Sequence, residues 1–385
     1  MRSLQPIVER DLEKRFVLLA GPRQVGKTHL ALEMLKAKPG RYYNWDLAED
    51  RQKILEKGFL HDGLAVMDEL HKYERWKSFL KGTYDKYHEK LKILVTGSAR
   101  LDVYRRGGDS LFGRHYLLHL HPLTVGEILT PNEIPRPANL PEKMEEKQGS
   151  TEAFSTLLKF GGFPHPFYQG SVEEHGRWSI QRRELLVRQD IRDLTHIHLL
   201  NLIEHFLLLL PRHVGSVLSV NSLKEDLQVA YNTVRQWLGA FERLYISFAL
   251  QPYHVKVNRS LQKASKVYLW DWSQVEDEGD RLENMIASHL LKAVHLWRDL
   301  GFGDFELFYL RDRDRREVDF CVTKDRKPWL LAEVKLAELN LHESLHVFAE
   351  KFGVPAFQIV GKEGVDIQRG AIRIISASRF LSTLP

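Results

Sequence analysis

The chain has little cysteine and no long hydrophobic run. Its single cysteine, Cys321, excludes an intrachain disulfide and a cysteine-rich zinc site, as expected for a protein of the reducing cytoplasm. Apolar runs such as Phe206 to Leu210 are far too short to span a bilayer, and no charged segment followed by an apolar one opens the chain. We therefore predict a cytoplasmic protein without membrane contact.

Neither sign of charge dominates strongly. The formal net charge is +5 over 385 residues and the pI is about 9.0, which is a weak indication of an acidic partner such as nucleic acid. Hydrophobic residues make up 43% of the chain and charged residues 28%, proportions typical of a globular protein. A chain of this length is too long for one ordinary core, so two to four domains are expected.

The first strong motif is GPRQVGKT at residues 21–28, which matches G-x-x-x-x-G-K-[ST] and follows the apolar run Phe16 to Ala20. In such a loop the glycines permit a tight turn whose N–H groups face phosphates. Lys27 supplies positive charge for the outer phosphates, and Thr28 supplies a hydroxyl for Mg²⁺. The chain is therefore predicted to bind ATP with Mg²⁺. The expected nucleotide contacts are Gly21, Pro22, Arg23, Gln24, Val25, Gly26, Lys27, Thr28 and His29.

Two acids follow a second apolar run, Leu64 to Met67. A buried strand that ends in carboxylates delivers them to the edge of a sheet. Asp68 is predicted to hold Mg²⁺ through water, and Glu69 to orient or deprotonate the attacking water. The run Ile93 to Thr96 leads to Ser98, a weaker candidate for sensing the γ-phosphate or placing that water.

Phosphoryl transfer also needs positive charge on the leaving oxygens, often from an arginine of a neighbouring subunit. Arg114, in Phe112-Gly113-Arg114, and Arg100 are the candidates. Either could equally be a solvated arginine unrelated to phosphate.

Together, residues 21–28, 64–69, 95–100 and 111–127 resemble the AAA-type ATPases of prokaryotes that carry a restriction-endonuclease-like C-terminal domain of unassigned function. The resemblance covers nearly the whole chain and is strongest at the phosphate loop and at Asp68 and Glu69. It implies a nucleotide-driven core, active sites shared between the subunits of a homo-oligomer, and a role linked to nucleic acid.

Changes of pattern along the chain predict four domains. Strand-like and helical runs alternate over residues 1–130, which predicts an α/β domain with a parallel sheet, the AAA-type P-loop ATPase domain. Residues 131–195 are expected to form a linker and a helical lid. Residues 196–280 follow the plan of a winged helix-turn-helix, and residues 281–385 that of a second α/β domain resembling PD-(D/E)xK nucleases.

The predicted helix-turn-helix leaves a polar face on its second helix, and this face is a candidate for contacts with base edges or phosphates. A wing near Lys256, Asn258, Arg259 and Lys263 would add phosphate contacts. DNA is the favoured partner, although winged folds also serve as protein-binding or structural modules. The face includes Tyr231, Asn232, Thr233, Arg235 and Gln236.

Two alternating segments, residues 316–322 and 329–335, predict a β-hairpin with a turn over Thr323 to Pro328. Pairing centred on Arg326 places Asp319 opposite Glu333, and Glu317 opposite Lys335, on a polar face that also holds Cys321. The alternative is a plain cross-strand ion pair of Glu317 with Lys335 on a solvated face.

The acids Asp319 and Glu333, with Lys335 two residues beyond the second, resemble the D…E-x-K core of restriction-type nucleases. The resemblance implies that both acids bind Mg²⁺ and that the lysine positions the water. Glu283, on the preceding helical run, matches the family's helical glutamate, a further metal ligand. Four arginines just upstream could meet a phosphate backbone, namely Arg311, Arg313, Arg315 and Arg316.

These modules predict a Mg²⁺-dependent ATPase whose nucleotide state regulates nucleic-acid engagement or metal-dependent cleavage. The alternative is a non-cleaving ATP-driven remodeller of DNA or protein, or an assembly switch, in which Asp319, Glu333 and Lys335 are structural. A cleavage assay distinguishes the first function from the second, and light scattering with and without ATP tests the assembly switch.

Overall fold

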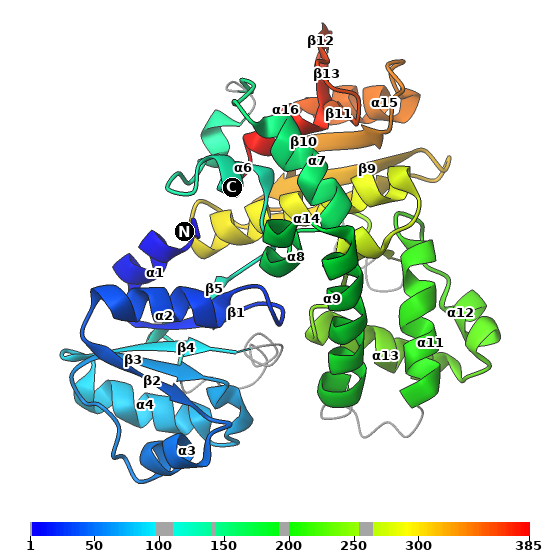
Figure 1. The fold of residues 1–385 in the computed structure, drawn as a ribbon. Helices are drawn as coiled ribbons and strands as arrows, with labels where there is room; N and C mark the ends of the chain where they lie inside the picture. Colours follow the sequence, from blue (N-terminus) through cyan, green and yellow to red (C-terminus); the bar gives the residue numbers. More distant parts are fainter. Residues whose placement is uncertain (1, 98–110, 141–143, 192–199, 254–264) are drawn as a thin grey trace. The chain divides into compact units, whose positions relative to one another are not determined.

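The computed structural model describes residues 2–97, 111–140, 144–191, 200–253 and 265–385. These residues form two compact units, Met1–His121 and Pro122–Pro385, and each unit is described by itself. Figure 1 shows the elements of both. Among the described residues, no helix combines the length and apolar character needed to cross a bilayer.

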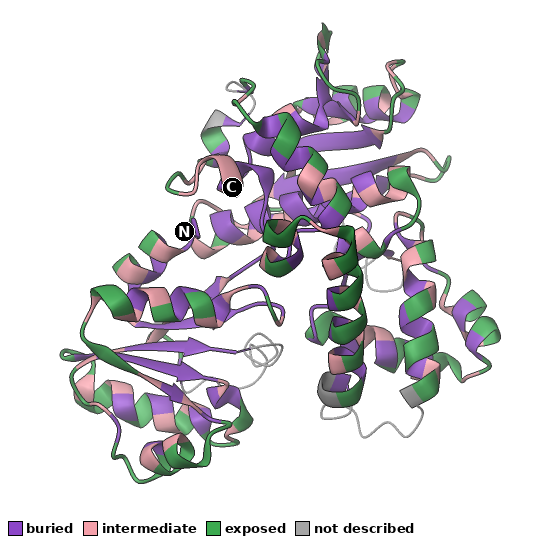
Figure 2. Cartoon of the chain, viewed as in Figure 1, coloured by how far each residue is buried: buried purple, intermediate pink, exposed green. Residues whose placement is uncertain are grey.

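The first unit is built on a five-stranded parallel sheet in the order β2-β3-β4-β1-β5, which confirms the predicted α/β class. Its central strands are continuous apolar runs, as expected where helices bury both faces of a parallel sheet (Figure 2). The strands are β1 (Phe16–Ala20), β2 (Gly40–Asn44), β3 (Gly63–Asp68), β4 (Leu91–Thr96) and β5 (His115–His119). The helices are α1 (Gln5–Leu12), α2 (Lys27–Ala37), α3 (Ala48–Leu55) and α4 (Trp76–Tyr87), with a short 3-10 turn at Leu70–Lys72.

Helices cover the two faces of this sheet in pairs, α1 and α2 on one face and α3 and α4 on the other (Figure 1). On the second face Phe16, Met67 and Ile93 pack with Ile54 of α3 and Trp76 of α4 in one apolar cluster. Because the strands are parallel, the carboxyl ends of β1, β3 and β4 lie at the same edge of the sheet. The phosphate loop, the two acids and Thr96 therefore meet there.

The second unit begins with helices. Gly161, with φ +75°, ends α7, and α9 continues into a π-helical turn at Leu186–Ile191. The helices are α6 (Val125–Leu129), α7 (Ser150–Phe160), α8 (Pro164–Gln169), α9 (Val172–Leu185), α11 (Leu200–Leu209), α12 (Val220–Leu227) and α13 (Tyr231–Arg243). Short 3-10 turns lie at Pro137–Asn139, Leu210–His213 and Trp272–Gln274.

Helices α12 and α13 are joined by residues 228–230, of which Gln228 has the left-handed φ of +51°. Leu223 and Leu227 of α12 and Val234 and Phe241 of α13 are buried, as expected for two helices that pack together. Strands β6 (Ser247–Leu250) and β7 (Lys266–Leu269) pair antiparallel behind them. The proposed wing residues Lys256, Asn258, Arg259 and Lys263 lie outside the described residues, so the winged helix remains a prediction.

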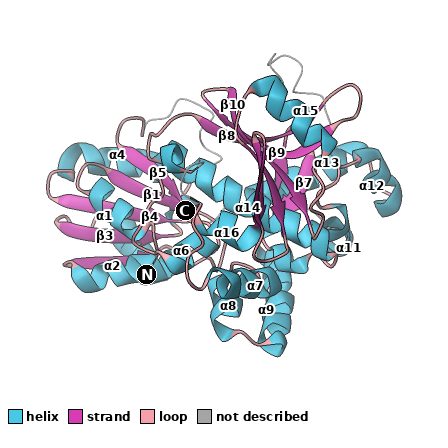
Figure 3. Ribbon diagram, turned by 90° about the horizontal axis from the view of Figure 1, so that it is seen from above, coloured by secondary structure: helices cyan, strands magenta, loops and turns pink. Residues whose placement is uncertain are grey.

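The rest of the second unit is a mixed six-stranded sheet in the order β12-β13-β11-β10-β9-β8. The long helix α14 (Glu278–Asp299) contacts β8, β9 and β10, whereas α15 (Glu343–Phe352) packs on the other face and α16 (Ala377–Ser382) beside β11 and β13 (Figure 3). The strands are β8 (Phe305–Arg311), β9 (Glu317–Lys324), β10 (Lys327–Lys335), β11 (Ala356–Val360), β12 (Asp366–Arg369) and β13 (Ile372–Ser376).

The hairpin of β9 and β10 forms, but its turn is shorter than predicted. Asp325 and Arg326, with φ of +51° and +66°, make a two-residue turn, which suits the twist of the two strands. A register shift between Pro328 and Leu330 then restores the predicted pairing, because Leu330 pairs with Val322. The paired residues end with Ala332 and Phe320, next to the predicted pair of Asp319 and Glu333.

The alternative of a solvated hairpin face is wrong, because Asp319 and Glu333 are buried. Strands β9 and β10 are inner strands, and Cys321 is fully buried with Leu331 and Phe348 in the cluster under α15. Burial raises the pKa of the Cys321 thiol well above its usual value. The thiol is therefore a packing group at neutral pH, as expected for a buried cysteine without a nearby base.

Residues 122–129 belong to the second unit, although they directly follow the strand β5 in sequence. Gly126 of α6 approaches the chain's last residues so closely that a Cβ would lie 1.8 Å from the carbonyl oxygen of Leu384. A buried ion pair of 2.6 Å joins Glu127 to Lys292 of α14. The predicted boundary at residue 130 remains a prediction.

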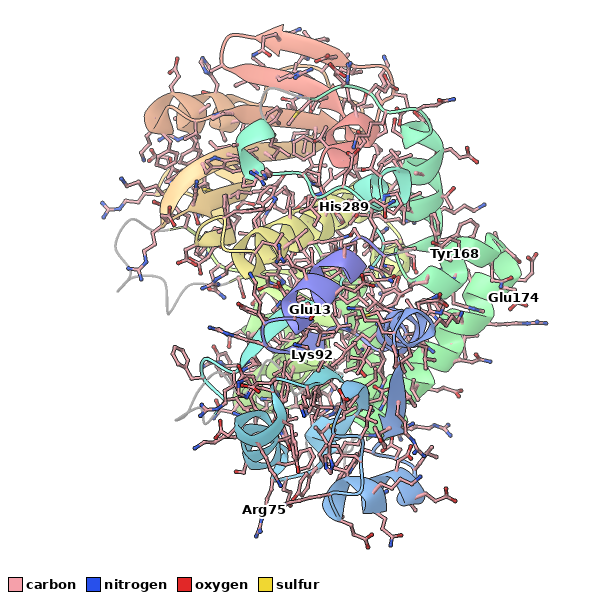
Figure 4. All side chains as sticks on the ribbon, turned by 90° about the vertical axis from the view of Figure 1, so that its left-hand side faces the viewer. Glu13, Arg75, Lys92, Tyr168, Glu174 and His289 are labelled. Atoms are coloured by element: carbon pink, nitrogen blue, oxygen red, sulfur yellow. The ribbon has the colours of Figure 1, made fainter. Side chains whose placement is uncertain are left out.

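His289 of α14 is fully buried at the same place (Figure 4). Its Nε2 accepts a hydrogen bond from the Val125 N–H at 3.1 Å, and its Nδ1 donates to the Met285 carbonyl at 2.8 Å. This pattern requires a neutral ring. Burial lowers the pKa of His289 to about 3, and the positive charge of Lys292 acts in the same direction.

His289 is expected to make the second unit less stable in acid. Because the folded-state pKa lies below the unfolded value of about 6.5, the stabilisation is complete above pH 6.5 and is lost as the pH falls toward about 3. Between pH 7 and pH 5 the loss is about 2 kcal/mol. Urea unfolding of the wild type and of His289→Gln measures it. Equal losses in both proteins would contradict this assignment.

Candidate functional site

The phosphate loop connects β1 to α2 and is shaped by positive φ angles. Gly21 has a φ of +150°, and a Cβ there would lie 2.3 Å from the Leu120 carbonyl oxygen. Gln24 and Gly26 have φ angles of +64° and +101°. The loop therefore curls tightly and ends where α2 begins, so that the positive end of the helix dipole lies at the loop.

Lys27 lies inside this loop and is only 7% exposed. Its Nζ donates to the carbonyl oxygens of Gly21, at 2.9 Å, and of Pro22, at 2.7 Å. These two hydrogen bonds place the ammonium inside the loop, where ATP phosphates are expected to bind. His29 follows on the first turn of α2 and is exposed.

Asp68 ends β3 and collects three hydroxyl groups. Its Oδ2 accepts from Thr28 at 2.9 Å and from Tyr42 at 2.7 Å, and its Oδ1 accepts from Thr96 at the end of β4. Burial, and next the hydrogen bond to Asp68, raise the pKa of the Tyr42 hydroxyl, which stays a donor. Thr28 and Asp68 place two side-chain oxygens next to each other. Because Mg²⁺ prefers oxygen ligands, these residues fit that ion.

Glu69 follows in a left-handed conformation, with φ of +55°, and its side chain is 18% exposed. Burial raises the pKa of this carboxyl. Its Oε2 has no hydrogen-bond partner among the described residues, although His71 Nε2 lies 3.5 Å away and Lys72 Nζ 3.7 Å away. A buried carboxylate oxygen with spare hydrogen-bonding capacity, beside the Mg²⁺ ligands, is suited to bind and orient a water molecule.

The remaining candidates of the first unit, Ser98, Arg100 and Arg114, are not among the described residues at the phosphate loop. Ser98 and Arg100 lie outside the described residues. Arg114 precedes β5, and its carbonyl oxygen accepts from Phe16 N–H at the start of β1, the end opposite the phosphate loop. Its Nε donates to Asp85 Oδ1 at 2.7 Å.

Two contacts at this site are not indicated by the sequence motifs. Tyr42 reaches Asp68 from the neighbouring strand, and Arg2 donates to the carbonyl oxygens of Val25, at 2.7 Å, and of His121. Arg2 therefore ties the phosphate loop to the residue that closes this unit. Neither residue belongs to a motif, because each acts through a contact between distant parts of the chain.

A second polar cluster lies in the second unit, and its centre is Lys266, the first residue of β7. The Lys266 Nζ lies 2.8 Å from Glu317 Oε1, 3.0 Å from Asp319 Oδ1 and 3.5 Å from Glu283 Oε1. Burial alone would lower the pKa of Lys266, but the three carboxylates outweigh it and raise that pKa above its usual value. The lysine is therefore a fully charged ammonium.

The predicted nuclease-like residues do come together around this lysine. The Asp319 N–H donates to Glu333 Oε2 at 3.2 Å, and Lys335 Nζ donates to Glu333 Oε1 at 2.8 Å. Burial, and next the charge of Asp319, raise the pKa of both Glu283 and Glu333. The alternative, an ion pair of Glu317 with Lys335, does not form, since Glu317 pairs with Lys266 and with Arg311.

Two of the four arginines upstream of β9 pair with nearby acids, whereas Arg313 and Arg315 are exposed. Arg316 contacts Asp312 at 2.7 Å and Asp314 at 2.8 Å, and Arg311 contacts Glu317 at 3.4 Å. The loop therefore presents less free positive charge than its sequence suggests, because its acidic residues alternate with the basic ones.

The carboxylate cluster does not fit a divalent metal ion as it stands. Three of its acids, Glu283, Glu317 and Asp319, already surround an ammonium. Within the part of the chain that the structure describes, no group of three or more His, Cys, Asp or Glu side chains is arranged to hold a metal. The sequence signal for Lys266 is only a single lysine at the start of the short strand β7, and in sequence it lies far from the hairpin whose acids it contacts.

Comparison with known families covers most of the chain. Residues 13–129 match a model described as AAA domain. Residues 151–275 and 278–379 match two models described as domains of unknown function, DUF8612 and DUF4143. The chain thus contains an AAA-type ATPase domain, followed by two segments whose families have no assigned function.

The similar proteins of known sequence are uncharacterized. Protein Rv2008c of Mycobacterium tuberculosis is 25% identical over 385 residues, which span 91% of this chain and 82% of that protein. Protein MJ1637 of Methanocaldococcus jannaschii is 23% identical over 68% of this chain and 61% of its own length.

Among solved structures, the Walker-type ATPase paby2304 of Pyrococcus abyssi is 15% identical, with a TM-score of 0.39 over 70% of this chain and 93% of that one. The RuvB Holliday junction branch migration motor of Thermotoga maritima is 18% identical, with a TM-score of 0.28 over 64% of this chain and 85% of its own. Similarities this low do not support a statement about the function of this chain.

Proposed function

We propose that this protein binds and hydrolyses ATP with Mg²⁺ and that its nucleotide state controls engagement of nucleic acid, with DNA favoured. The observation that carries the ATPase assignment is the hydrogen bond between Thr28 and Asp68, with Glu69 as the next residue and Lys27 inside the loop. These are the groups that phosphoryl transfer to water requires.

The residues have separate roles in this reaction. Lys27 and the N-terminus of α2 bind and orient the phosphates, and Thr28 and Asp68 would hold the metal ion. Bound Mg²⁺ supplies positive charge to the phosphate oxygens. Glu69 orients the water and accepts its proton through Oε2, while Tyr42 and Thr96 hold the Asp68 carboxylate in place.

We further propose a homo-oligomer in which Arg114 serves a neighbouring subunit. Arg114 lies at the start of β5, whereas its own phosphate loop follows the far end of β1. Five residues of strand separate them by about 16 Å, well beyond the reach of its side chain. A catalytic arginine in this position therefore acts on ATP bound by an adjacent copy.

The proposal that the second unit engages nucleic acid rests on the exposed face of α13. Tyr231, Asn232, Arg235 and Gln236 are exposed there, and Thr233 is half-buried. Beside this face lies a groove of about 850 Å³ with a mixed lining, which includes Ser219, Asn221 and Arg235 as well as Glu242 and Leu238. Hydroxyl, amide and guanidinium groups on one open surface suit phosphates and base edges.

Fluorescence anisotropy with a short labelled DNA duplex tests this engagement. Arg235→Ala is expected to weaken binding about tenfold and to reduce the dependence on salt by about one ion, because one phosphate contact is lost. Affinity is also expected to differ between the states with ADP and with a non-hydrolysable ATP analogue.

The matched control is Arg177→Ala, which removes an exposed arginine from α9 and is expected to leave DNA affinity unchanged. DNA affinity that does not respond to salt or to Arg235→Ala would contradict the proposal. If ATP then changes only the size of the assembly in light scattering, the chain is an assembly switch. Metal-dependent cleavage is not part of this proposal, because Lys266 stands among the carboxylates that would hold the metal.

A further inference from the structure

We infer that Lys266 is a built-in counter-ion that takes the place of a divalent metal among Glu283, Glu317 and Asp319, so that the second unit binds no metal at these carboxylates and does not cut nucleic acid. The inference is independent of ATP hydrolysis and of DNA binding by α13. In this view the nuclease-like acids neutralise a buried lysine and do not bind a metal ion.

The position of the ammonium is the first argument. Lys266 is 2% exposed, and its Nζ lies within 3.5 Å of carboxylate oxygens from α14 and from β9. A buried ammonium is costly unless acids surround it, and here three acids do. A divalent cation at the same oxygens would meet this positive charge at close range, with little water to screen it.

The second argument is that the three carboxylates have little remaining capacity to bind a cation. Glu283 accepts a hydrogen bond from Tyr268 at 2.7 Å, Asp319 accepts one from the Val334 N–H at 3.0 Å, and Glu317 pairs with Arg311 at 3.4 Å. Each carboxylate therefore has a protein donor besides Lys266. Magnesium and manganese need several free oxygen ligands, and this cluster offers few.

The backbone of β7 holds the lysine in position. Lys266 pairs with Leu250 of β6, and the Ser265 carbonyl accepts a hydrogen bond from Leu218 N–H at 2.9 Å. These contacts fix the backbone from which the side chain reaches the carboxylates. The cluster joins β7, which follows the predicted helix-turn-helix, to α14 and to the C-terminal sheet.

The decisive variant is Lys266→Met in the full chain, which keeps a long side chain and removes the charge. All proteins carry Asp68→Asn and are free of nucleotide, so that the first unit contributes no metal site. With Lys266 present, Mn²⁺ is expected neither to bind in calorimetry nor to raise the unfolding temperature. Lys266→Met is expected to unfold at lower temperature, to gain one Mn²⁺ and to recover stability when Mn²⁺ is added.

Lys292→Met is the matched control, because it removes another buried lysine, which pairs with Glu127 at 2.6 Å outside this carboxylate cluster. It is expected to lose stability that Mn²⁺ does not restore. If Lys266→Met binds no Mn²⁺ although it is folded, the lysine does not take the place of a metal and the inference fails.

A second measurement decides the matter if Lys266→Met does not fold. Three proteins are compared: the wild-type chain, Asp319→Asn and Glu333→Gln. Each is incubated with DNA and with RNA in the presence of Mg²⁺ or Mn²⁺. No cleavage by any of the three supports the inference. Metal-dependent cleavage that both substitutions abolish would overturn it, while leaving the ATPase proposal intact.

Discussion

Lys27→Ala is expected to reduce ATP turnover by about 10³-fold or more and to weaken ATP binding. Its ammonium is the buried positive charge within the phosphate loop, held there by the carbonyl oxygens of Gly21 and Pro22. Alanine removes the charge that stabilises the phosphates both in the bound state and during transfer. Loss of one such electrostatic group costs about 10²- to 10³-fold even when it is a neutral donor.

Steady-state phosphate release and binding of a fluorescent ATP analogue measure the two effects of Lys27→Ala. Lys36→Ala is the control, since Lys36 belongs to the same helix but is exposed and pairs only with Glu33. Its turnover should equal that of the wild type. Undiminished hydrolysis by Lys27→Ala would remove the ATPase assignment.

Glu69→Gln is expected to separate binding from hydrolysis. ATP affinity should change little, because Glu69 is not among the groups that hold the phosphates or the metal ion. Turnover should fall by about 10²- to 10⁴-fold, since glutamine cannot accept the proton of the attacking water. The amide can occupy the same space, so this effect measures chemistry rather than folding.

Single-turnover hydrolysis together with ATP affinity measures the effect of Glu69→Gln. Glu74→Gln, five residues further and exposed, is the matched control. Normal single-turnover rates in Glu69→Gln would assign the base to another residue. Equal losses of affinity and of turnover would instead indicate that Glu69 positions the nucleotide.

Much of the fold could be predicted because it depends on local pattern. Runs such as Phe16 to Ala20 are apolar throughout, which is typical of strands buried on both faces of a parallel sheet, and they occur as β1, β3 and β4. The hairpin of β9 and β10 was predictable from alternation. Its shorter turn and its register shift were not, since they depend on positive φ angles at Asp325 and Arg326 that these residue types do not demand.

The burial of that hairpin's polar side chains and of Cys321 could not be predicted, for a tertiary reason. Alternation gives the two faces of a strand but does not say what covers them. Helices α14 and α15 lie on opposite faces of the sheet, so Cys321 is part of a core and the acids are enclosed. The packing of these helices therefore decides that the acidic side chains are buried, which the alternation of residues along the strand could not indicate.

By itself the sequence determined the phosphate loop, the acids after β3 and the α/β class, because each depends on residues adjacent in the chain. Only the tertiary structure decided which distant groups contact the buried carboxylates. Tyr42 reaches Asp68 from another strand, and Lys266 reaches Asp319 across 53 residues. A buried charge must find a partner wherever the fold provides one, and no local pattern records that choice.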